Sequence, residues 1–431
     1  MLDFYAIKLS FSFNSLCYFR LMPNAVTRST DSIQLIDICA GIFLIGMVCS
    51  KALLAIGMVI FCLAAIFQYG KSYTREAKTL SILLMPAIIF GATILSGINS
   101  EDLSVWGEFI AKKVPFLLLP IAFYLAKERM AYRYYDFLMA FVIIVAVVSL
   151  GVLTNYLMNF EVLNEAIGRG KAITTPIDHT EFSIFVAFAA VVSLYLYVEE
   201  KRVVRIGTRS TLLMLCIFLV LFLHILAVRS GLAVLYITFF LMAVYTFVKS
   251  KRYGLLAGSL LLMMLLPLVA VNVVPSLKTK LDYVNWDFHR HDIGKGVTYS
   301  DSERIYSLQA GLEIFRGNMI IGTGIGDLKH ECQKIYQRRL GKVLEHYPHN
   351  QYLFVLSGLG VVGFIFYSIA LLGPLVRLRG HYDPYFLTLH CVVFVSALVE
   401  NTIERTFSIG FYLFFVLAGI CYLTRKWAQP K

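Results

Sequence analysis

Twelve long apolar segments dominate the sequence and limit the folds open to it. They lie at about 33–50, 52–69, 80–99, 114–126, 134–158, 182–198, 211–228, 232–249, 254–275, 350–373, 384–399 and 407–424. Most approach the roughly 20 residues that a helix needs to cross the hydrocarbon core of a bilayer. Only 15% of the residues are charged, whereas soluble domains carry about 25%. The sequence therefore predicts an all-α polytopic membrane protein with about twelve transmembrane helices.

The net charge of +12 does not indicate nucleic-acid binding, because membrane proteins concentrate Lys and Arg in their cytoplasmic segments. If the N-terminus is cytoplasmic, most basic residues of the short connections fall on the inside. We therefore expect both termini in the cytoplasm and the long hydrophilic segment 276–349 on the outside. Long loops are exempt from the charge rule, so the basic residues of 276–349 do not oppose this orientation.

The expected organisation is a cytoplasmic or interfacial segment (1–32), nine helices (33–275), the long outside loop (276–349), three helices (350–424) and a cytoplasmic tail (425–431). Within the loop, apolar residues recur at helical spacing over about 301–315, and a Gly-rich break at 322–326 precedes a polar stretch at about 327–340. This pattern predicts two amphipathic helices over the outer membrane face.

His349 and Asn350 stand at the start of the apolar segment 350–373. Near pH 7 an unperturbed imidazole can both accept and release a proton. Asn350 can cap the next helix, whose positive dipole end disfavours a charged His349. His349 is therefore a candidate general base, although a structural histidine bonded to nearby backbone is equally compatible with the pattern. The glycines of 358–363 follow no strand, so they are not a nucleotide loop, and we expect them to permit close helix packing.

Two arginines are candidates for binding phosphate. Arg229 and Ser230 interrupt two apolar segments at the outer membrane edge. Ser230 can cap the next helix, and a helix N-terminus beside an arginine suits a phosphate group. Arg304 begins the first predicted loop helix, and Glu400 belongs to the last outside turn, where it can orient His349 or an arginine. Each also has a simpler interpretation as a solvated or interfacial side chain.

The other ionisable residues are interpreted as structural. Lys112 and Lys113 lie at the outer membrane edge, where we expect them to contact lipid headgroups. His224 and His390 fall inside apolar segments, so we expect neutral, hydrogen-bonded rings. The eight cysteines form no CxxC or Cys/His cluster and the carboxylates form no convincing ligand set. We expect neither a disulfide framework nor a metal site.

These motifs together resemble a known family. His349 and Asn350, followed by nine residues, Gly360, two residues and Gly363, resemble the signature of bacterial O-antigen ligases. The turn 229–231 is similar to the Ser-Arg-Gly turn of the wider O-antigen ligase and polymerase superfamily, with Val228 where many members have Ser. The segment 302–305 and the glycines that follow resemble the family's loop arginine and Gly-rich stretch. The resemblance covers about residues 180–424.

The resemblance implies a GT-C-like membrane glycosyltransferase in the bacterial inner membrane, with its active site facing the periplasm. The implied reaction moves a glycan from undecaprenyl pyrophosphate to an acceptor hydroxyl, in the family a sugar of the lipid A core. His349 would accept the hydroxyl proton, and Arg229 and Arg304 would hold the pyrophosphate. Direct attack by the hydroxyl would invert the anomeric centre, with neither metal nor cofactor. The supporting residues would be Ser230, Asn350 and Glu400.

Three alternatives remain open. A polymerase of the same superfamily would extend one lipid-linked glycan with another and shares the arginines and the general plan. A protein O-oligosaccharyltransferase would use a protein hydroxyl as acceptor. A transporter of lipid-linked glycans should place broken helices and ionisable residues near the bilayer midplane, whereas the conspicuous charges here lie at the outer ends of the helices. In every case the expected partners are membrane lipid and a lipid-linked glycan.

Overall fold

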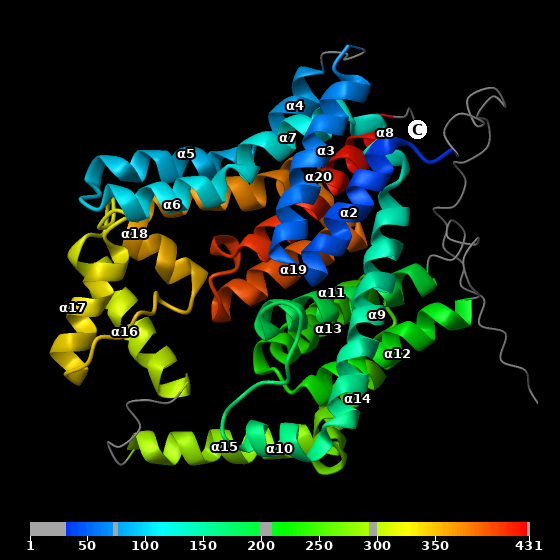
Figure 1. Cartoon of the computed structure of the whole chain (residues 1–431). Helices are drawn as coiled ribbons and strands as arrows, with labels where there is room; N and C mark the ends of the chain where they lie inside the picture. The colour runs from blue at the N-terminus through cyan, green and yellow to red at the C-terminus, as the bar shows by residue number, and fades with distance from the viewer. Residues whose placement is uncertain (1–31, 72–75, 199–208, 293–299, 429–431) are drawn as a thin grey trace, which may run out of the picture.

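The computed structural model describes residues 32–71, 76–198, 209–292 and 300–428. In these ranges the chain folds into helices joined by short turns, without a strand (Figure 1). The predicted all-α class is confirmed. The predicted N-terminal segment 1–32 lies almost wholly outside the described residues, and the last helix runs to Ala428, past the predicted start of the tail.

The helices of the N-terminal half are α2 (Leu35–Cys49), α3 (Lys51–Tyr69), α4 (Ala77–Leu83), α5 (Ala87–Leu95), α6 (Leu103–Lys113), α7 (Pro115–Leu125), α8 (Lys127–Tyr132), α9 (Tyr134–Met158), α10 (Phe160–Gly168), α11 (His179–Val198) and α12 (Arg209–Leu226). Those of the C-terminal half are α13 (Arg229–Lys249), α14 (Tyr253–Val273), α15 (Pro275–Asp292), α16 (Ser300–Gly317), α17 (Leu328–Leu340), α18 (Gln351–Arg377), α19 (Pro384–Val399) and α20 (Thr406–Ala428). The 3-10 turns are η1 (Ser96–Asn99), η2 (Gly380–Tyr382) and η3 (Thr402–Glu404).

Among the described residues, seven helices are long and apolar enough to cross a membrane. The pair α4 and α5, bent by 55°, makes an eighth span if it is counted as one. Each of the twelve predicted apolar segments forms helix, but α2, α12 and α19 are shorter apolar helices and α7 has only 11 residues. The polytopic membrane character is confirmed, while the number twelve and the GT-C-like arrangement remain predictions. The seven long helices are α3, α9, α11, α13, α14, α18 and α20.

Helices α20 and α11 form the centre of the molecule. Their apolar windows are 89% and 78% buried, compared with 6% for α14, which lies at the periphery. Aromatic rings fill the space between these central helices: Phe185 of α11 stacks on Phe411 of α20 with ring centroids 4.8 Å apart. Phe141 of α9 meets Phe415 of α20 edge to face, the arrangement that aromatic quadrupoles favour. This core fixes the positions of α11 and α20, whose N-terminal ends adjoin residues of the site.

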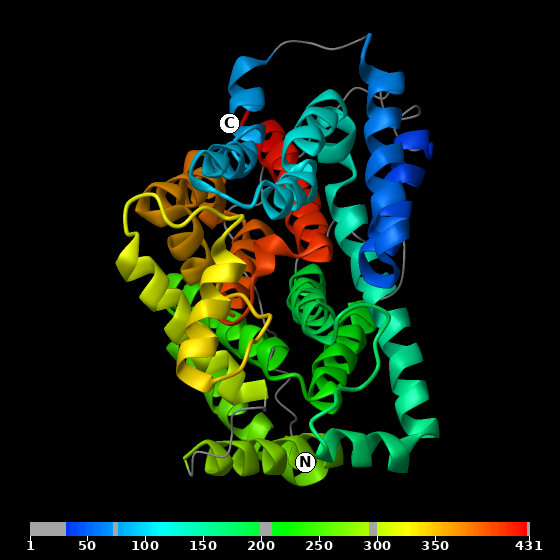
Figure 2. The same cartoon turned by 60° about the vertical axis from the view of Figure 1, so that its left-hand side comes forward.

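The predicted outside loop contains three described helices. α16 and α17 coincide with the two predicted ones, and α15 is an additional helix. α15 lies beside α10 at one end of the molecule, opposite the C-terminal end of α20 (Figures 1 and 2). Leu277 and Val284 of α15 are buried, and Lys280 donates a hydrogen bond to the carbonyl of Gly170 after α10. Contacts with residues that are distant in the sequence therefore stabilise α15, a helix that the local sequence pattern does not predict.

Helix α18 is broken at Gly360. This residue has φ 65° and ψ −168° inside an otherwise helical segment, a combination open essentially to glycine alone. The break frees backbone groups, and the loop between α16 and α17 satisfies them. The N–H groups of Val361 and Val362 donate to the carbonyls of Met319 and Ile320, at 2.8 and 3.1 Å.

The same loop also bonds to the other side of the break. The N–H groups of Thr323 and Gly324 donate to the carbonyls of Ser357 and Gly358, both at 3.0 Å. We predicted that the 358–363 glycines permit close helix packing, but the backbone that approaches Gly358 and Gly360 most closely belongs to the 320–322 loop segment. This junction attaches α16 and α17 to α18.

Candidate functional site

A buried carboxylate joins three segments that are far apart in the sequence. Glu400 follows α19, and its side chain is only 3% exposed. Its Oε1 accepts a 2.6 Å hydrogen bond from Arg304 of α16. Its Oε2 accepts a 3.1 Å hydrogen bond from Arg405, between η3 and α20, and lies 3.8 Å from Nδ1 of His349. We call these four residues the Glu400 cluster.

His349 is held by the elements on both sides of it. Its backbone N–H donates to the hydroxyl of Ser307 on α16, at 3.2 Å. Asn350 is the N-cap of α18, as predicted: its side-chain oxygen accepts from the N–H of Leu353, and its amide group donates to the carbonyl of Leu398, each at 2.9 Å. The start of α18 is thus attached to α16 and to α19, which fixes His349 opposite Glu400.

Arg304 lies on the second turn of α16, and its side chain is 31% exposed. One of its terminal nitrogens bonds to Glu400, which leaves further N–H groups of the planar guanidinium for a ligand. Glu303, next to it, lies 3.3 Å from Nε2 of His346, whose ring is 5.6 Å from the ring of His349. The cluster therefore has a polar, partly exposed side formed by Arg304, Glu303 and His346, while the Glu400 carboxylate is buried.

The charges of the cluster stabilise one another. Burial alone would raise the pKa of Glu400, but His349, Arg405 and Arg304 outweigh it, so this pKa lies below its ordinary value. Burial also opposes ionisation of Asp178, and Arg405 outweighs it, so the pKa of Asp178 is lowered too. Desolvation would lower the pKa of Arg405, but Glu400 and Asp178 together raise it. Near pH 7 both carboxyl groups are therefore ionised.

Arg405 extends the cluster to α11. Its Nη1 lies 3.0 Å from Oδ1 of Asp178, immediately before α11. Glu181, on the first turn of that helix, accepts hydrogen bonds from the backbone N–H and the hydroxyl of Ser408, at 3.1 and 2.8 Å. The N-terminal ends of α11 and α20 are thereby joined, and the sequence pattern singled out neither Asp178 nor Glu181.

Arg229 begins α13, which packs along α11 (Figure 1). Gly231 lies so close to Ser183 of α11 that a Cβ atom on Gly231 would overlap the serine side chain. The first turn of α13 is therefore held against the first turns of α11, the helix that begins directly after Asp178. The side chain of Arg229 is partly exposed.

The predicted capping role of Ser230 is wrong. Val228 is the N-cap residue of α13, and Ser230 lies buried inside the first turn. The preceding Ala227 has φ 53°, so the chain turns sharply there and the helix starts earlier than the pattern indicated. The predicted lipid contact of Lys113 is also wrong: its side chain is 0% exposed and pairs with Glu404. Lys112 is 42% exposed, which is compatible with a headgroup contact.

The two intramembrane histidines match their predicted structural role of hydrogen-bonded core residues. His224 bonds to the carbonyl of Val220 and to the hydroxyl of Tyr236, and His390 bonds to the carbonyl of Phe386. Within the described ranges, no group of three or more His, Cys, Asp or Glu side chains is arranged to hold a metal ion. The Glu400 cluster itself presents an imidazole, a carboxylate and two guanidinium groups.

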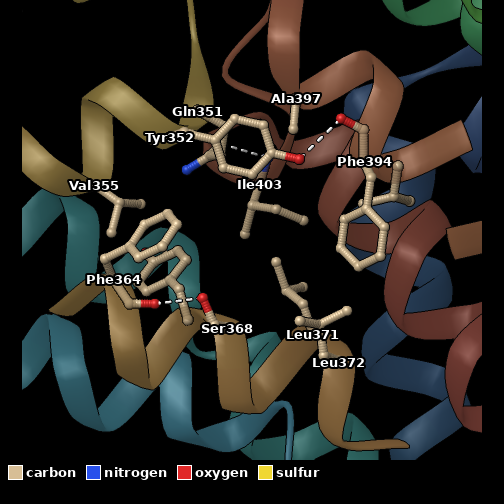
Figure 3. Close-up of a pocket in the computed structure, with 12 residues that line it drawn as sticks. Gln351, Tyr352, Val355, Phe364, Ser368, Leu371, Leu372, Phe394, Ala397 and Ile403 are labelled. Atoms are coloured by element: carbon tan, nitrogen blue, oxygen red, sulfur yellow. Dashed lines mark hydrogen bonds between the residues drawn. The ribbon is translucent and has the colours of Figure 1, made fainter. Parts of the chain in front are cut away.

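An apolar cavity of about 360 Å³ lies between α19 and the two arms of α18 (Figure 3). Its lining includes Gln351, Ala397 and Ile403, each within three residues of His349 or Glu400 in the sequence. The rest of the lining is mainly aliphatic and aromatic. Those other lining residues are Tyr352, Val355, Phe364, Tyr367, Ser368, Leu371, Leu372, Val393 and Phe394.

Residues 214–368 match the family model described as O-antigen ligase. The matched region contains Arg229, Arg304 and His349, together with Gly360 and Gly363, while Glu400 and Arg405 lie beyond it. The match confirms the family resemblance that the motifs predicted. No curated protein matches the chain.

Proposed function

We propose that this chain, which is similar to the O-antigen ligase family over residues 214–368, is an inverting glycosyltransferase. It moves a glycan from undecaprenyl pyrophosphate to an acceptor hydroxyl, a sugar of the lipid A core, on the periplasmic face of the inner membrane. The observation that carries the proposal is the Glu400 cluster, in which a histidine and two arginines converge on one buried carboxylate at the ends of membrane helices.

In the proposed reaction, His349 is the general base. With Nδ1 facing the Glu400 carboxylate, the ring carries its proton on Nδ1 and leaves Nε2 to accept the proton of the acceptor hydroxyl. The hydroxyl oxygen attacks the anomeric carbon, the bond from that carbon to the phosphate oxygen breaks, and the electron pair leaves with the pyrophosphate. Glu400 stabilises the imidazolium that forms. A single displacement of this kind inverts the anomeric centre.

The leaving pyrophosphate needs cations as its charge increases. The open side of the Arg304 guanidinium offers N–H groups in a planar fork that fits phosphate oxygens. Arg229, the first residue of α13, would supply a second guanidinium to the phosphate, together with the N-terminus of that helix. Such preorganised donors are most effective where charge develops in the transition state.

The apolar cavity supports a lipid-linked donor. An isoprenoid chain leaving the pyrophosphate at Arg304 needs an apolar path within a few ångströms of the cluster. The cavity between α19 and the two arms of α18 would offer one, since Gln351 at its edge (Figure 3) directly follows His349 and Asn350 in the sequence. We therefore propose that the first isoprene units of the donor lie there.

The decisive experiment is a transfer assay with the purified protein and a lipid-linked oligosaccharide, with and without lipid A-core. His349→Ala tests the base, and His330→Ala is a matched control, because His330 is an exposed histidine on α17 outside the cluster. We expect a core-dependent product with inverted anomeric configuration that His330→Ala still makes and His349→Ala loses.

Other outcomes distinguish the alternatives. A ladder of longer lipid-linked chains without core would identify a polymerase, and transfer to an added protein acceptor would identify a protein O-oligosaccharyltransferase. Flipping of a fluorescent lipid-linked glycan without any transfer would identify a transporter. Retention of configuration, or near-normal turnover by His349→Ala, would refute the proposed mechanism.

A further inference from the structure

A second ionic network lies buried behind the Glu400 cluster. Lys113, the last residue of α6, has a side chain that is 0% exposed, and its Nζ lies 2.9 Å from Oε2 of Glu404, which is 7% exposed. The ammonium group also donates to the backbone carbonyl of Ile403. A cation buried among apolar helices is costly and persists only where partners compensate its lost hydration. Here both partners belong to one short turn, η3.

Gln351 connects this turn to the start of α18. Its side-chain oxygen accepts from the N–H of Ile403 at 2.9 Å, and its amide group donates to Oε1 of Glu404 at 3.0 Å. Tyr367, on the far arm of α18, donates to the same carboxylate at 3.4 Å. Figure 3 shows Gln351 and Ile403 adjacent at the edge of the cavity. Gln351 is 2% exposed, and both the oxygen and the amide group of its side chain are hydrogen-bonded within the network.

The network fastens the two segments that carry the reactive groups. His349 lies two residues before Gln351, while Glu400 and Arg405 lie on either side of η3. We propose that Lys113 is a positioning residue: through Glu404 and Gln351 it holds the 400–405 turn against the start of α18, and so holds His349 at its distance from Glu400. The catalytic part of this inference depends on the proposed function, and the anchoring part does not.

Transfer rate and its pH dependence should respond to Lys113 although it touches no substrate. The groups that face His349 are Glu400 from the α19 end, Arg405 from the η3 turn, and Arg304 and the His346–Glu303 pair from the outer loop. Only Glu400 and Arg405 lie on the turn that Lys113 holds. Loosening that turn changes their distances to the imidazole, while Arg304, Glu303 and His346 stay in place.

The test compares Lys113→Met with Lys112→Met. Methionine matches the lysine side chain as far as Cε and lacks only its ammonium group, and Lys112 is the adjacent, half-exposed lysine of the same helix, paired with Glu108. We expect Lys113→Met to lower turnover by about 10- to 100-fold, the size expected for a small misplacement of catalytic groups, with the KM for donor little changed. The acidic limb of its pH–rate profile, which reports protonation of the proposed base, should move, and Lys112→Met should match the wild type in all three readouts.

Lys113→Met leaves Glu404 buried without its cation, so a second variant separates positioning from folding. Lys113→Met with Glu404→Gln removes both charges and should recover the melting temperature, but it should stay slow because Ile403 still lacks its ammonium donor. A double variant with wild-type melting temperature, turnover and pH profile would overturn the proposal and leave Lys113 a purely stabilising residue.

Hydrogen exchange tests the anchoring role of Lys113 without an activity assay. Lys113→Met should speed exchange of the Ile403 amide and of its neighbours in 400–405, while Lys112→Met should not. Unchanged exchange in Lys113→Met would overturn the anchoring role even if turnover fell. If the wild type shows no His349-dependent transfer, the proposed function fails, and the exchange comparison still decides whether Lys113 anchors the turn.

Discussion

Glu400 shows how a single side chain can organise a site. A carboxylate that is 3% exposed is tolerated only if its lone pairs are used and its charge is balanced. Arg304 and Arg405 supply that balance, and His349 completes the environment. Because these partners come from three different segments, the carboxylate joins those segments and also orients the proposed base.

Replacing Arg304 or Arg229 by alanine should lower the transfer rate by about two to three powers of ten, the loss typical of removing one preorganised donor. Arg316→Ala is the control, since Arg316 is an exposed arginine near the other end of α16. Initial rates at saturating donor, with size-exclusion profiles to verify folding, are the measurement. Equal losses in all three variants would contradict a specific role for Arg304 and Arg229.

Glu400→Gln should make the free energy of unfolding less dependent on pH in the acidic range. The folded-state pKa of Glu400 is lowered, so its carboxylate stabilises the protein above the unfolded value of about 4.3, and this contribution disappears as the pH falls through the lower folded value. The gap in melting temperature between wild type and Glu400→Gln should be constant from about pH 6 to 8 and should shrink below about pH 4. A gap that widens on acidification would contradict this assignment.

Helix α18 and the loop before α17 form one structural element. The loop supplies carbonyls to Val361 and Val362 and N–H groups to Ser357 and Gly358, which a straight helix would not need. A spanning helix can be interrupted only where other protein groups satisfy its backbone. The glycines of the family signature are therefore explained by backbone geometry: they let α18 break and let the loop approach it.

Gly360→Ala should destabilise the protein strongly. Its φ of 65° with ψ −168° is strained for alanine by about 1–3 kcal/mol, and a Cβ atom there would overlap the carbonyl of Ile320. Gly358→Ala is the matched control, because a Cβ at Gly358 meets nothing closer than 3.4 Å. Melting temperature in detergent is the measurement, and equal melting of the two variants would show that the break is dispensable.

The cavity between the arms of α18 and α19 predicts a separate effect on the donor. Ala397→Phe would place a ring in a space of about 360 Å³, so the fold should tolerate it while the isoprenoid is excluded. Leu398→Phe is the control, since Leu398 is 53% exposed and adjacent on the same helix. We expect a raised KM for full-length donor in Ala397→Phe alone. A donor KM that stays at the wild-type value in Ala397→Phe would contradict the assignment.

The whole molecule has two distinct ends. α10 and α15 lie at the end opposite the C-terminal part of α20 (Figures 1 and 2), and the charge distribution predicts that this end faces the periplasm. In a cysteine-free background, Lys171→Cys, after α10, should react with a membrane-impermeant maleimide in intact cells. Lys251→Cys, between α13 and α14, should react only after permeabilisation, although both lysines are exposed. The reverse pattern would invert the proposed topology.

The sequence determined the helical membrane class, the family resemblance and the individual candidates Arg229, Arg304 and His349. Those signals are local, since the length of an apolar run, a capping residue and a short motif are all read within a few residues. Such local signals do not predict α15, because this helix is stabilised by contacts with α10 and with Gly170, which lie much earlier in the sequence.

Only the tertiary structure decided how the candidates meet. It placed Glu400 between Arg304, Arg405 and His349. It also buried Lys113 against Glu404, which lies near the far end of the sequence. Spacing along a helix indicates which face a residue occupies, but not which distant segment will cover that face. Burial and partner choice arise when packed helices exclude lipid and water from a charge, which then must find its counter-charge within the protein.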